Sequence, residues 1–191
     1  VVMNVTVDGA TAPSFLTAWP SGEARPGVSN LNYVAGQTVP NLVTVKVGAN
    51  GRVNLFNATG WVNVIADVVG YYTTTPPTSG GRFTSLTPTR LLDTRTGEGR
   101  GGAVGPVVAG QAIDVQVTGT GGVPASGVTG VALNVTVDQP TGSGYITSWP
   151  TGEARPTAST HNFTAGVTVA NLVLAKVGAG GKVSLFNSAG A

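Results

Sequence analysis

One eight-residue segment occurs twice in this chain, and the repeat around it constrains the fold more than any other feature. Residues 19–26 read WPSGEARP, and residues 149–156 read WPTGEARP, 130 positions later. The same offset aligns residues 1–60 with residues 131–190 without a gap. A repeat of this length is too long for a solenoid unit and matches the size of a small domain. The sequence therefore predicts two copies of one module.

The composition favours short strands over helices. The chain has 29 glycines and 12 prolines, two residue types that disfavour helix interiors, and its abundant Val and Thr favour strands. Apolar residues make up 41% of the chain, which is enough to build hydrophobic cores. Charged residues make up only 9%, so Thr, Ser, Asn and Gly must supply most of the polar surface. We therefore expect an all-β protein.

Charge and cysteine content argue against several functional classes. The net charge is +2 and the basic residues are scattered singly, whereas nucleic-acid binding needs clustered Lys and Arg. The absence of cysteine excludes disulfides, thiolate metal sites and cysteine nucleophiles. No apolar run approaches the ~18–20 residues that a membrane span requires. We expect no nucleic-acid partner, no membrane insertion and no cofactor.

Alternation of apolar and polar residues predicts the strands. The last strand of the first copy, at 61–72, is apolar on both faces, which predicts a central strand. Asn50-Gly51 lies between two alternating runs and predicts a tight hairpin turn with positive φ, an option that Gly180-Gly181 retains in the second copy. The expected strands are 1–7, 15–19, 29–34, 39–47, 53–57, 61–72, one within 82–95, 112–117, and the repeated set from 131.

The Thr/Pro/Gly-rich segment 74–81 has the composition of a linker. It divides the chain into 1–73, the C-terminal part of a first module, and 82–191, a second module lacking its last strand. Since Val1 falls inside the repeat unit, we expect the chain to be a fragment. About eight strands per complete module favour an antiparallel β-sandwich in tandem, with a β-trefoil or closed barrel as the alternative.

Three motifs resemble a known repeat. They are RLLDTR at 90–95, NLVTVKVG at 41–48 and VIADVVGYY at 64–72. Together they are similar to a tandem β-rich repeat of secreted and cell-surface actinobacterial proteins whose function is uncharacterised. The resemblance implies export, tandem placement and attachment to secreted enzymes or surface proteins. It implies no catalytic residues.

The titratable residues give no shared catalytic site. His161 is the only histidine, and its counterpart in the first copy is Leu31, so a Ser-His-Asp triad cannot exist in both modules. Imidazole or thiolate metal sites lack ligands. A pair of carboxylates could hydrolyse a glycosidic bond, but most of the eight acids have an evident structural use. We therefore predict a protein that is not an enzyme and holds no metal.

Several charged residues are predicted to form structural ion pairs. Each Glu of the repeated octapeptide stands two residues before an Arg, which suggests a salt bridge within the loop. Asp67 lies in an apolar strand and needs a partner, because an unpaired buried carboxylate costs several kcal/mol; the hypothesis is a pair with Arg90 or Arg95. The candidate ion-pair residues are Glu23, Arg25, Glu153, Arg155, Asp67, Asp93, Arg90 and Arg95.

An aromatic row recurs in both copies and has two interpretations. Phe15 and Trp19, like Tyr145 and Trp149, lie on one face of a predicted strand. An exposed row of rings could stack on sugars, which makes these four the candidate glycan contacts. The alternative is that the tryptophans pack under their own loops, and exposure of the rings distinguishes the two.

The sequence favours a non-catalytic extracellular structural or adhesive repeat module of a larger secreted or surface protein. The alternative is a carbohydrate-binding module that targets a secreted enzyme to polysaccharide or cell-wall glycan. Incomplete modules at both ends add the hypothesis of self-association by strand addition.

Overall fold

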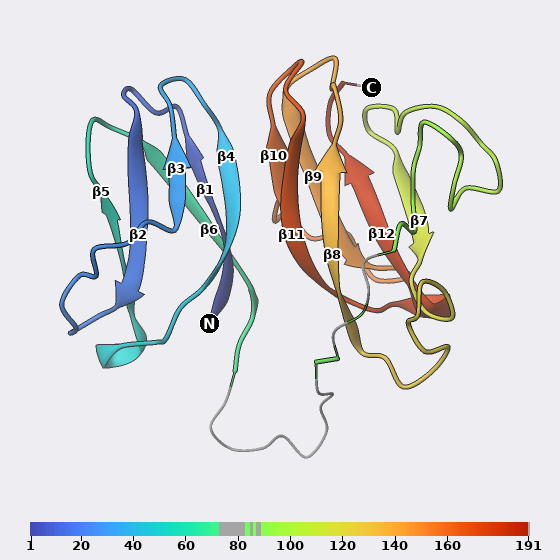
Figure 1. The fold of residues 1–191 in the computed structure, drawn as a ribbon, viewed down its shortest axis with the longest axis horizontal. Coiled ribbons are helices and arrows are strands. Elements are labelled where there is room, and N and C mark those ends of the chain that lie inside the picture. Colours follow the sequence, from blue (N-terminus) through green and yellow to red (C-terminus); the bar gives the residue numbers. More distant parts are fainter. Residues whose placement is uncertain (73–82, 85, 87–88, 191) are drawn as a thin grey trace.

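The computed structural model describes residues 1–72, 83–84, 86 and 89–190, and it consists of two β-sandwiches (Figure 1). We call residues 1–72 the first module and residues 83–190 the second module. The all-β prediction is confirmed, and among the described residues no sheet closes into a barrel. The predicted linker 74–81 lies outside the described residues.

The first module has two three-stranded antiparallel sheets. One sheet has the order β4-β1-β6, formed by β1 (Val2–Asp8), β4 (Val39–Thr44) and β6 (Asn63–Gly70). The other has the order β3-β2-β5, formed by β2 (Ser14–Pro20), β3 (Leu31–Tyr33) and β5 (Val53–Asn57). A short 3₁₀ turn, η1 (Ala49–Gly51), leads from the first sheet into β5.

The second module repeats this plan with one strand added and one absent from the described residues. Its small sheet pairs β8 (Gly130–Val137) with β11 (Val169–Lys176). Its larger sheet has the order β10-β9-β12-β7, with β7 (Ala112–Gln116), β9 (Gly144–Pro150), β10 (His161–Phe163) and β12 (Lys182–Asn187). The turn η2 (Ala179–Gly181) corresponds to η1.

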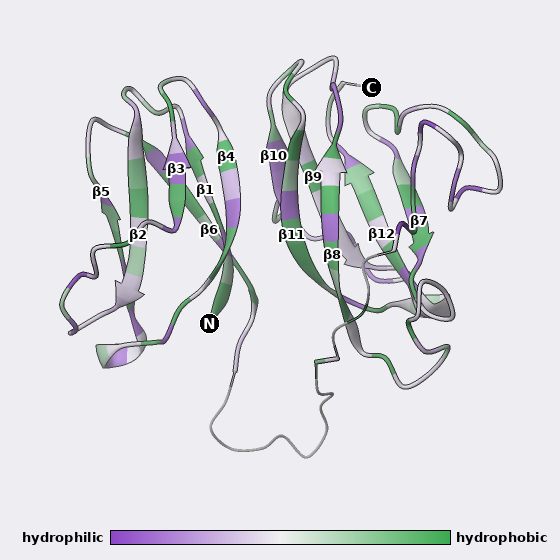
Figure 2. Ribbon diagram, viewed as in Figure 1, coloured by the Kyte–Doolittle hydropathy of each residue, from purple (hydrophilic) through white to green (hydrophobic). Residues whose placement is uncertain are grey.

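Alternate residues of the strands form a separate core in each module. In β1, Met3, Val5 and Val7 point inward and meet Leu16 and Ala18 of the opposite sheet. The second core is built in the same way from β7, β11, β12 and their neighbours. Figure 2 shows the underlying alternation of apolar and polar residues, for example along β8. Each core therefore lies between the two sheets of its own module.

The predicted hairpin between residues 39–47 and 53–57 is wrong. Asn50 and Gly51 do adopt positive φ values of 56° and 71°, as expected for that turn. However, β4 pairs with β1 while β5 pairs with β2, so the turn connects the two sheets of the sandwich. Two alternating strands can bury their apolar faces by facing each other across a core as well as by lying side by side.

The predicted central position of strand 61–72 is also wrong, because β6 lies at the edge of its sheet and β1 is central. The outer face of β6 approaches the second module, where Val69 lines the contact and Asp67 lies beside it opposite Asn4 of β1. The strand expected within 82–95 is reduced, among the described residues, to an isolated bridge between Asp93 and Glu98.

Packing of β7 makes the two cores unequal. Leu185 of β12 lies opposite Ile113 of β7 and is 9% exposed. Its counterpart Leu55 in β5 is 39% exposed, because no described strand of the first module lies beside β5 in that position. The first module is therefore the less completely covered of the two.

Candidate functional site

The repeated octapeptide forms a loop that folds back over the outer face of its sheet. In the first module the Thr17 hydroxyl donates to the Val28 carbonyl at 2.7 Å, and the Trp19 indole N–H donates to the Glu23 carbonyl at 3.0 Å. Trp149 makes the same bond to the Glu153 carbonyl at 3.0 Å. Both tryptophans are half-buried, and each indole N–H is occupied by its own loop. This geometry favours a packing role for the tryptophans.

The predicted salt bridges within these loops are wrong. Glu23 pairs with Lys46 at 2.7 Å, and the Arg25 guanidinium lies 3.7 Å above the centre of the Phe56 ring. A guanidinium can stack on an aromatic face and keep its charge hydrated, whereas a lysine ammonium acts as a point charge for the carboxylate. Spacing along the sequence did not reveal either partner, since both are distant in the chain: Lys46 lies just after β4, and Phe56 lies in β5.

The second module repeats this arrangement. Glu153 pairs with Lys176 at 2.5 Å, and Arg155 lies 3.8 Å above the Phe186 ring. Both salt bridges are exposed at the surface, so each contributes little to stability. The repetition shows that the loop contacts belong to the module, not to one copy.

Each module presents one exposed aromatic ring beside its stacked arginine. Phe15 is 37% exposed and lies 6.3 Å from Phe56 between ring centres. Tyr145 is 36% exposed and lies 6.3 Å from Phe186. Of the four predicted glycan contacts, Phe15 and Tyr145 are thus the more accessible. We call each set of ring, neighbouring ring and arginine an aromatic–arginine patch.

The second module holds a closed ion-pair cluster around Asp93. This carboxylate accepts from Arg90 at 2.6 Å and from the Arg95 guanidinium and backbone N–H at 2.9–3.0 Å. The contacts to Arg95, followed by those to Arg90, hold the pKa of Asp93 well below its usual range. Arg95 also reaches Asp138 at 3.1 Å. Because the side chain of Asp93 is fully engaged, the cluster serves to fix the loop that follows.

Asp67 does not pair with either arginine, so that hypothesis is wrong. Both arginines pair with Asp93. Asp67, on β6, lies opposite Asn4 of β1 and approaches the backbone of Ser159 in the second module. Burial at this contact raises the pKa of Asp67, and the Ser159 backbone opposes part of the shift. One carboxylate oxygen, Oδ2, is buried without a hydrogen-bond partner.

His161 is a core residue of the second module. Its side chain is fully buried on the same face of β10 as Phe163, and neither ring nitrogen has a hydrogen-bond partner. Burial lowers the pKa of His161 to about 4. The backbone of Val135 lies close enough to oppose this shift slightly, without a hydrogen bond of good geometry to either nitrogen. A catalytic histidine needs an orienting partner and access to substrate, and His161 has neither.

The most extensive polar contact that the sequence did not reveal lies between the modules. Asn4 of β1 donates to the Ser159 carbonyl at 3.1 Å and accepts from Asn171 of β11 at 2.9 Å. Asn171 also donates to the Thr160 carbonyl at 2.8 Å. Nothing in the sequence distinguishes Asn4 from its repeat counterpart Asn134, because only packing against the second module makes it different.

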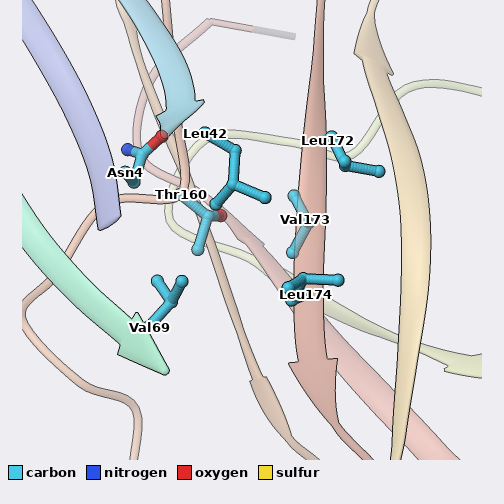
Figure 3. Close-up of a pocket in the computed structure, with 7 residues that line it drawn as sticks. All are labelled: Asn4, Leu42, Val69, Thr160, Leu172, Val173 and Leu174. Atoms are coloured by element: carbon cyan, nitrogen blue, oxygen red, sulfur yellow. The ribbon is translucent and has the colours of Figure 1, made fainter. Parts of the chain in front are cut away.

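Apolar side chains surround this polar contact. Figure 3 shows Leu42 and Val69 of the first module near Thr160, Val173 and Leu174 of the second. The cavity that they leave is about 10 Å³, which is room for one water molecule at most. The junction is therefore closely packed and offers no ligand site.

The part of the chain that the structure describes contains neither a metal cluster nor a membrane-spanning helix. No group of three or more His, Asp or Glu side chains lies close enough together to hold a metal ion. No helix in these residues has the length and apolarity to cross a membrane. Comparisons with family models, curated proteins and solved structures find no match to this chain.

Proposed function

We propose that the chain is a non-catalytic structural and adhesive unit of a larger extracellular protein, in which the two docked modules act as one stiff spacer. The observation that carries this proposal is the burial of Asn4 between the modules, with hydrogen bonds to Ser159 and Asn171. Separating the modules would expose these polar groups and the apolar side chains around them, so the docked arrangement resists bending.

The repeat provides an internal comparison for this burial. The outer-face residues of β1 are Val2, Asn4 and Thr6, and all three are at most 2% exposed. Their counterparts in β8 are Ala132, Asn134 and Thr136, and all three are exposed. The same face of the same module is therefore buried only where a second module packs on it. A repeated unit that docks in tandem suits a spacer.

Composition supports an extracellular setting. The chain is poor in charge and free of cysteine, and its loops are held by hydrogen bonds to neighbouring strands. Loops tied down in this way expose few flexible segments to proteases. The resemblance to repeats of secreted actinobacterial proteins points in the same direction.

Small-angle scattering tests the spacer. Asn4→Arg places a charge inside the junction and should increase the radius of gyration, because the modules separate. Asn134→Arg makes the same change at the exposed counterpart and should leave the radius of gyration unchanged. Wild-type scattering that fits two freely jointed modules would contradict the proposal.

Carbohydrate binding is the second candidate, supported by the exposed rings of Phe15 and Tyr145 in equivalent patches. A glycan array and pull-down with insoluble cell-wall polysaccharide test it. Binding that Phe15→Ala and Tyr145→Ala abolish without a change in melting temperature would favour this candidate over an inert spacer.

A further inference from the structure

The arginine of each aromatic–arginine patch carries an unpaired charge. The Arg155 guanidinium lies 3.8 Å above the centre of the Phe186 ring, and the Arg25 guanidinium lies 3.7 Å above that of Phe56. Both arginines are exposed, and within the described residues neither guanidinium has a hydrogen-bond or ion-pair partner. The glutamate of each octapeptide pairs with a lysine instead. Each patch therefore holds a cation whose N–H donors are free.

Stacking on a ring prepares this cation for an anionic ligand. A guanidinium is planar, so the ring covers one face and leaves open the edge that carries the N–H donors. A carboxylate matches this edge with two parallel hydrogen bonds. Arg95 already makes such a contact with Asp93, whereas Arg25 and Arg155 have no carboxylate partner in the described part of the chain. The two patches are therefore suited to a carboxylate from another molecule.

Exposure of the patch does not depend on the strand that differs between the modules. In the second module β7 lies beside β12, and in the first module no described strand lies beside β5 in that position. The exposed ring is nevertheless covered to the same extent, since Phe15 is 37% exposed and Tyr145 is 36% exposed. Ile146 packs against the core, so Tyr145 beside it faces outward. The patch therefore belongs to the outer face of its sheet in both modules.

Tyr145 supplies a flat apolar surface close to the cation. The ring centres of Tyr145 and Phe186 are 6.3 Å apart, and the Arg155 guanidinium lies 3.8 Å from the same Phe186 centre. Tyr145 and Arg155 are therefore at most about 10 Å apart, which is the sum of these two distances. Sugar rings pack their C–H faces on aromatic side chains, and one or two such rings span this separation. A sugar on Tyr145 therefore brings its own carboxylate, or that of the next sugar, to Arg155.

An asparagine accompanies each exposed ring. Asn162 of β10 lies opposite Tyr145, and Asn32 of β3 lies opposite Phe15. Side chains directly opposite each other in an antiparallel pair share a face, with Cβ atoms about 5 Å apart. An amide group both donates to and accepts from hydroxyl groups. A ring, an amide and a free guanidinium on one face favour a sugar with a carboxylate over a neutral sugar, which leaves the charge unpaired, and over an acidic peptide, which leaves the ring uncovered.

We propose that each aromatic–arginine patch binds a carboxylate-bearing sugar of an acidic polysaccharide. The pyranose ring packs on Tyr145 or Phe15, and its carboxylate pairs with Arg155 or Arg25. This inference rests on the carbohydrate-binding candidate and adds to it the class of glycan and the role of the arginine. The two modules carry equivalent patches, so one chain offers two such sites, and a polymer that reaches both binds more tightly than a short oligosaccharide.

Calorimetric titration of the intact chain tests whether the charge of the ligand matters. The probes are the trisaccharides of galacturonate and of mannuronate, which carry one carboxylate per ring, and their methyl esters, which have the same rings without charge. We expect at least one acid to bind at two sites about fivefold more tightly than its ester, and to bind less tightly as NaCl is raised. Equal affinities of acid and ester would overturn the inference and leave carbohydrate binding standing. Binding of none of the four probes would contradict both.

Substitution of the arginines locates the site. Arg25→Gln combined with Arg155→Gln removes both stacked charges and should lower the affinity for the acid to that of its ester, while the ester binds as before. Arg52→Gln combined with Lys182→Gln is the matched control, because these residues occupy equivalent positions outside the patches and the net charge falls by the same amount. An equal loss of affinity in the control variant would show attraction by net charge alone and would contradict a site at the patches.

Melting temperatures measured on the same variants separate ligand binding from loop stability, because the stacked arginine also holds its loop. If the glutamine variant melts lower, Arg25→Lys combined with Arg155→Lys keeps the charge and should keep part of the preference for the acid. A purely structural arginine would weaken the binding of acid and ester equally, which would contradict the proposal.

Hexaglutamate distinguishes the source of the carboxylate. Binding of this peptide as tight as that of the acidic sugars would assign the patches to acidic peptides and overturn the proposal. The spacer is tested by scattering at the Asn4 junction, where none of these variants lies, so its failure can be recognised separately.

Discussion

The side-chain amide of Asn171 donates a hydrogen bond to the side-chain oxygen of Asn4 at 2.9 Å across the junction between the modules. The repeat counterparts of these residues do not share the contact. Asn134 is exposed, and Asn41 donates to the carbonyl of Asn30 within the first module. Identical residues at equivalent positions thus hold different roles, and the difference lies in what packs against them.

Asn4→Ala should lower the free energy of unfolding by about 2 kcal/mol, because it leaves buried partners in the second module without a hydrogen bond. Asn134→Ala should change it by less than about 0.5 kcal/mol, since that side chain is exposed. Urea denaturation followed by tryptophan fluorescence measures both. Equal effects of the two substitutions would show that the modules do not dock in solution.

His161→Leu should stabilise the second module by about 1–2 kcal/mol at neutral pH, because it removes two buried ring nitrogens that lack partners. Leu31 occupies the equivalent position of the first module, so the shape suits the core. In the wild type, the His161 ring binds a proton more readily in the unfolded chain than in the folded chain. The free energy of unfolding therefore falls as the pH drops from 6.5 towards 4.

The variant should lose this pH dependence, which melting temperatures measured from pH 7 to pH 4 would show. A histidine with a role in catalysis or in pH sensing would give a different result. In that case the substitution would abolish an activity instead of only stabilising the fold.

Asp67→Asn should stabilise the chain at neutral pH by less than about 1 kcal/mol, because it removes a partly buried carboxylate with an unpaired oxygen. Burial raises the pKa of Asp67 in the folded state, so the native chain binds the proton more readily. The stability that protonation of Asp67 supplies is present below the unfolded pKa of 3.8 and is lost as pH rises through the folded pKa. Denaturation curves of the variant and wild type across this range provide the measurement.

The contribution of Asp93 to stability should depend on pH in the opposite direction to that of Asp67. Its pKa is depressed by Arg95 and Arg90, so its stabilising contribution is present above the unfolded value of 3.8 and is lost as pH falls below it. Asp93→Asn should therefore destabilise the second module at pH 7 and reduce the difference in stability between pH 7 and pH 3. An unchanged melting temperature at pH 7 would argue that the ion pairs do not form in solution.

Gly178→Ala should be strongly destabilising, by about 3 kcal/mol or more. An added Cβ would lie 2.1 Å from the backbone nitrogen of Thr151 and 2.3 Å from its carbonyl oxygen. Gly180→Asn is the matched control in the same turn, because Asn50 adopts the equivalent positive φ in the first module. That variant should fold with nearly unchanged stability. Thermal unfolding by circular dichroism compares the two.

Local patterns predicted most of the strands. The alternation in residues 1–7 and 112–117 placed β1 and β7 to within a residue or two, because the period of two follows directly from strand geometry. The positive φ at Asn50 was predicted from the Asn50-Gly51 pair between two alternating runs. The pairing of β4 and β5 did not follow, since the same alternation suits both a hairpin and a crossing between sheets.

Side-chain partners were the least predictable feature. The Glu of each octapeptide stands two residues from an arginine, yet it pairs with a lysine 23 positions along the chain. Asp67 was expected to need an arginine because its strand is apolar, but the outer face of that strand serves the junction between modules. Contacts of this kind depend on which strands become neighbours in the fold, and the spacing of residues along the sequence does not show which strands these are.

The sequence by itself determined the repeated module, the all-β class and the positions of most strands, because these depend on residue periodicity and on turn residues that act within a few positions. Only the tertiary structure decided which copy of each repeated residue is buried. Asn4 and Asn134 are identical in type and strand position, and the docking of the second module against β1 makes one a buried bridge while the other stays exposed. The physical reason is that burial is set by the neighbouring surface, which no local pattern encodes.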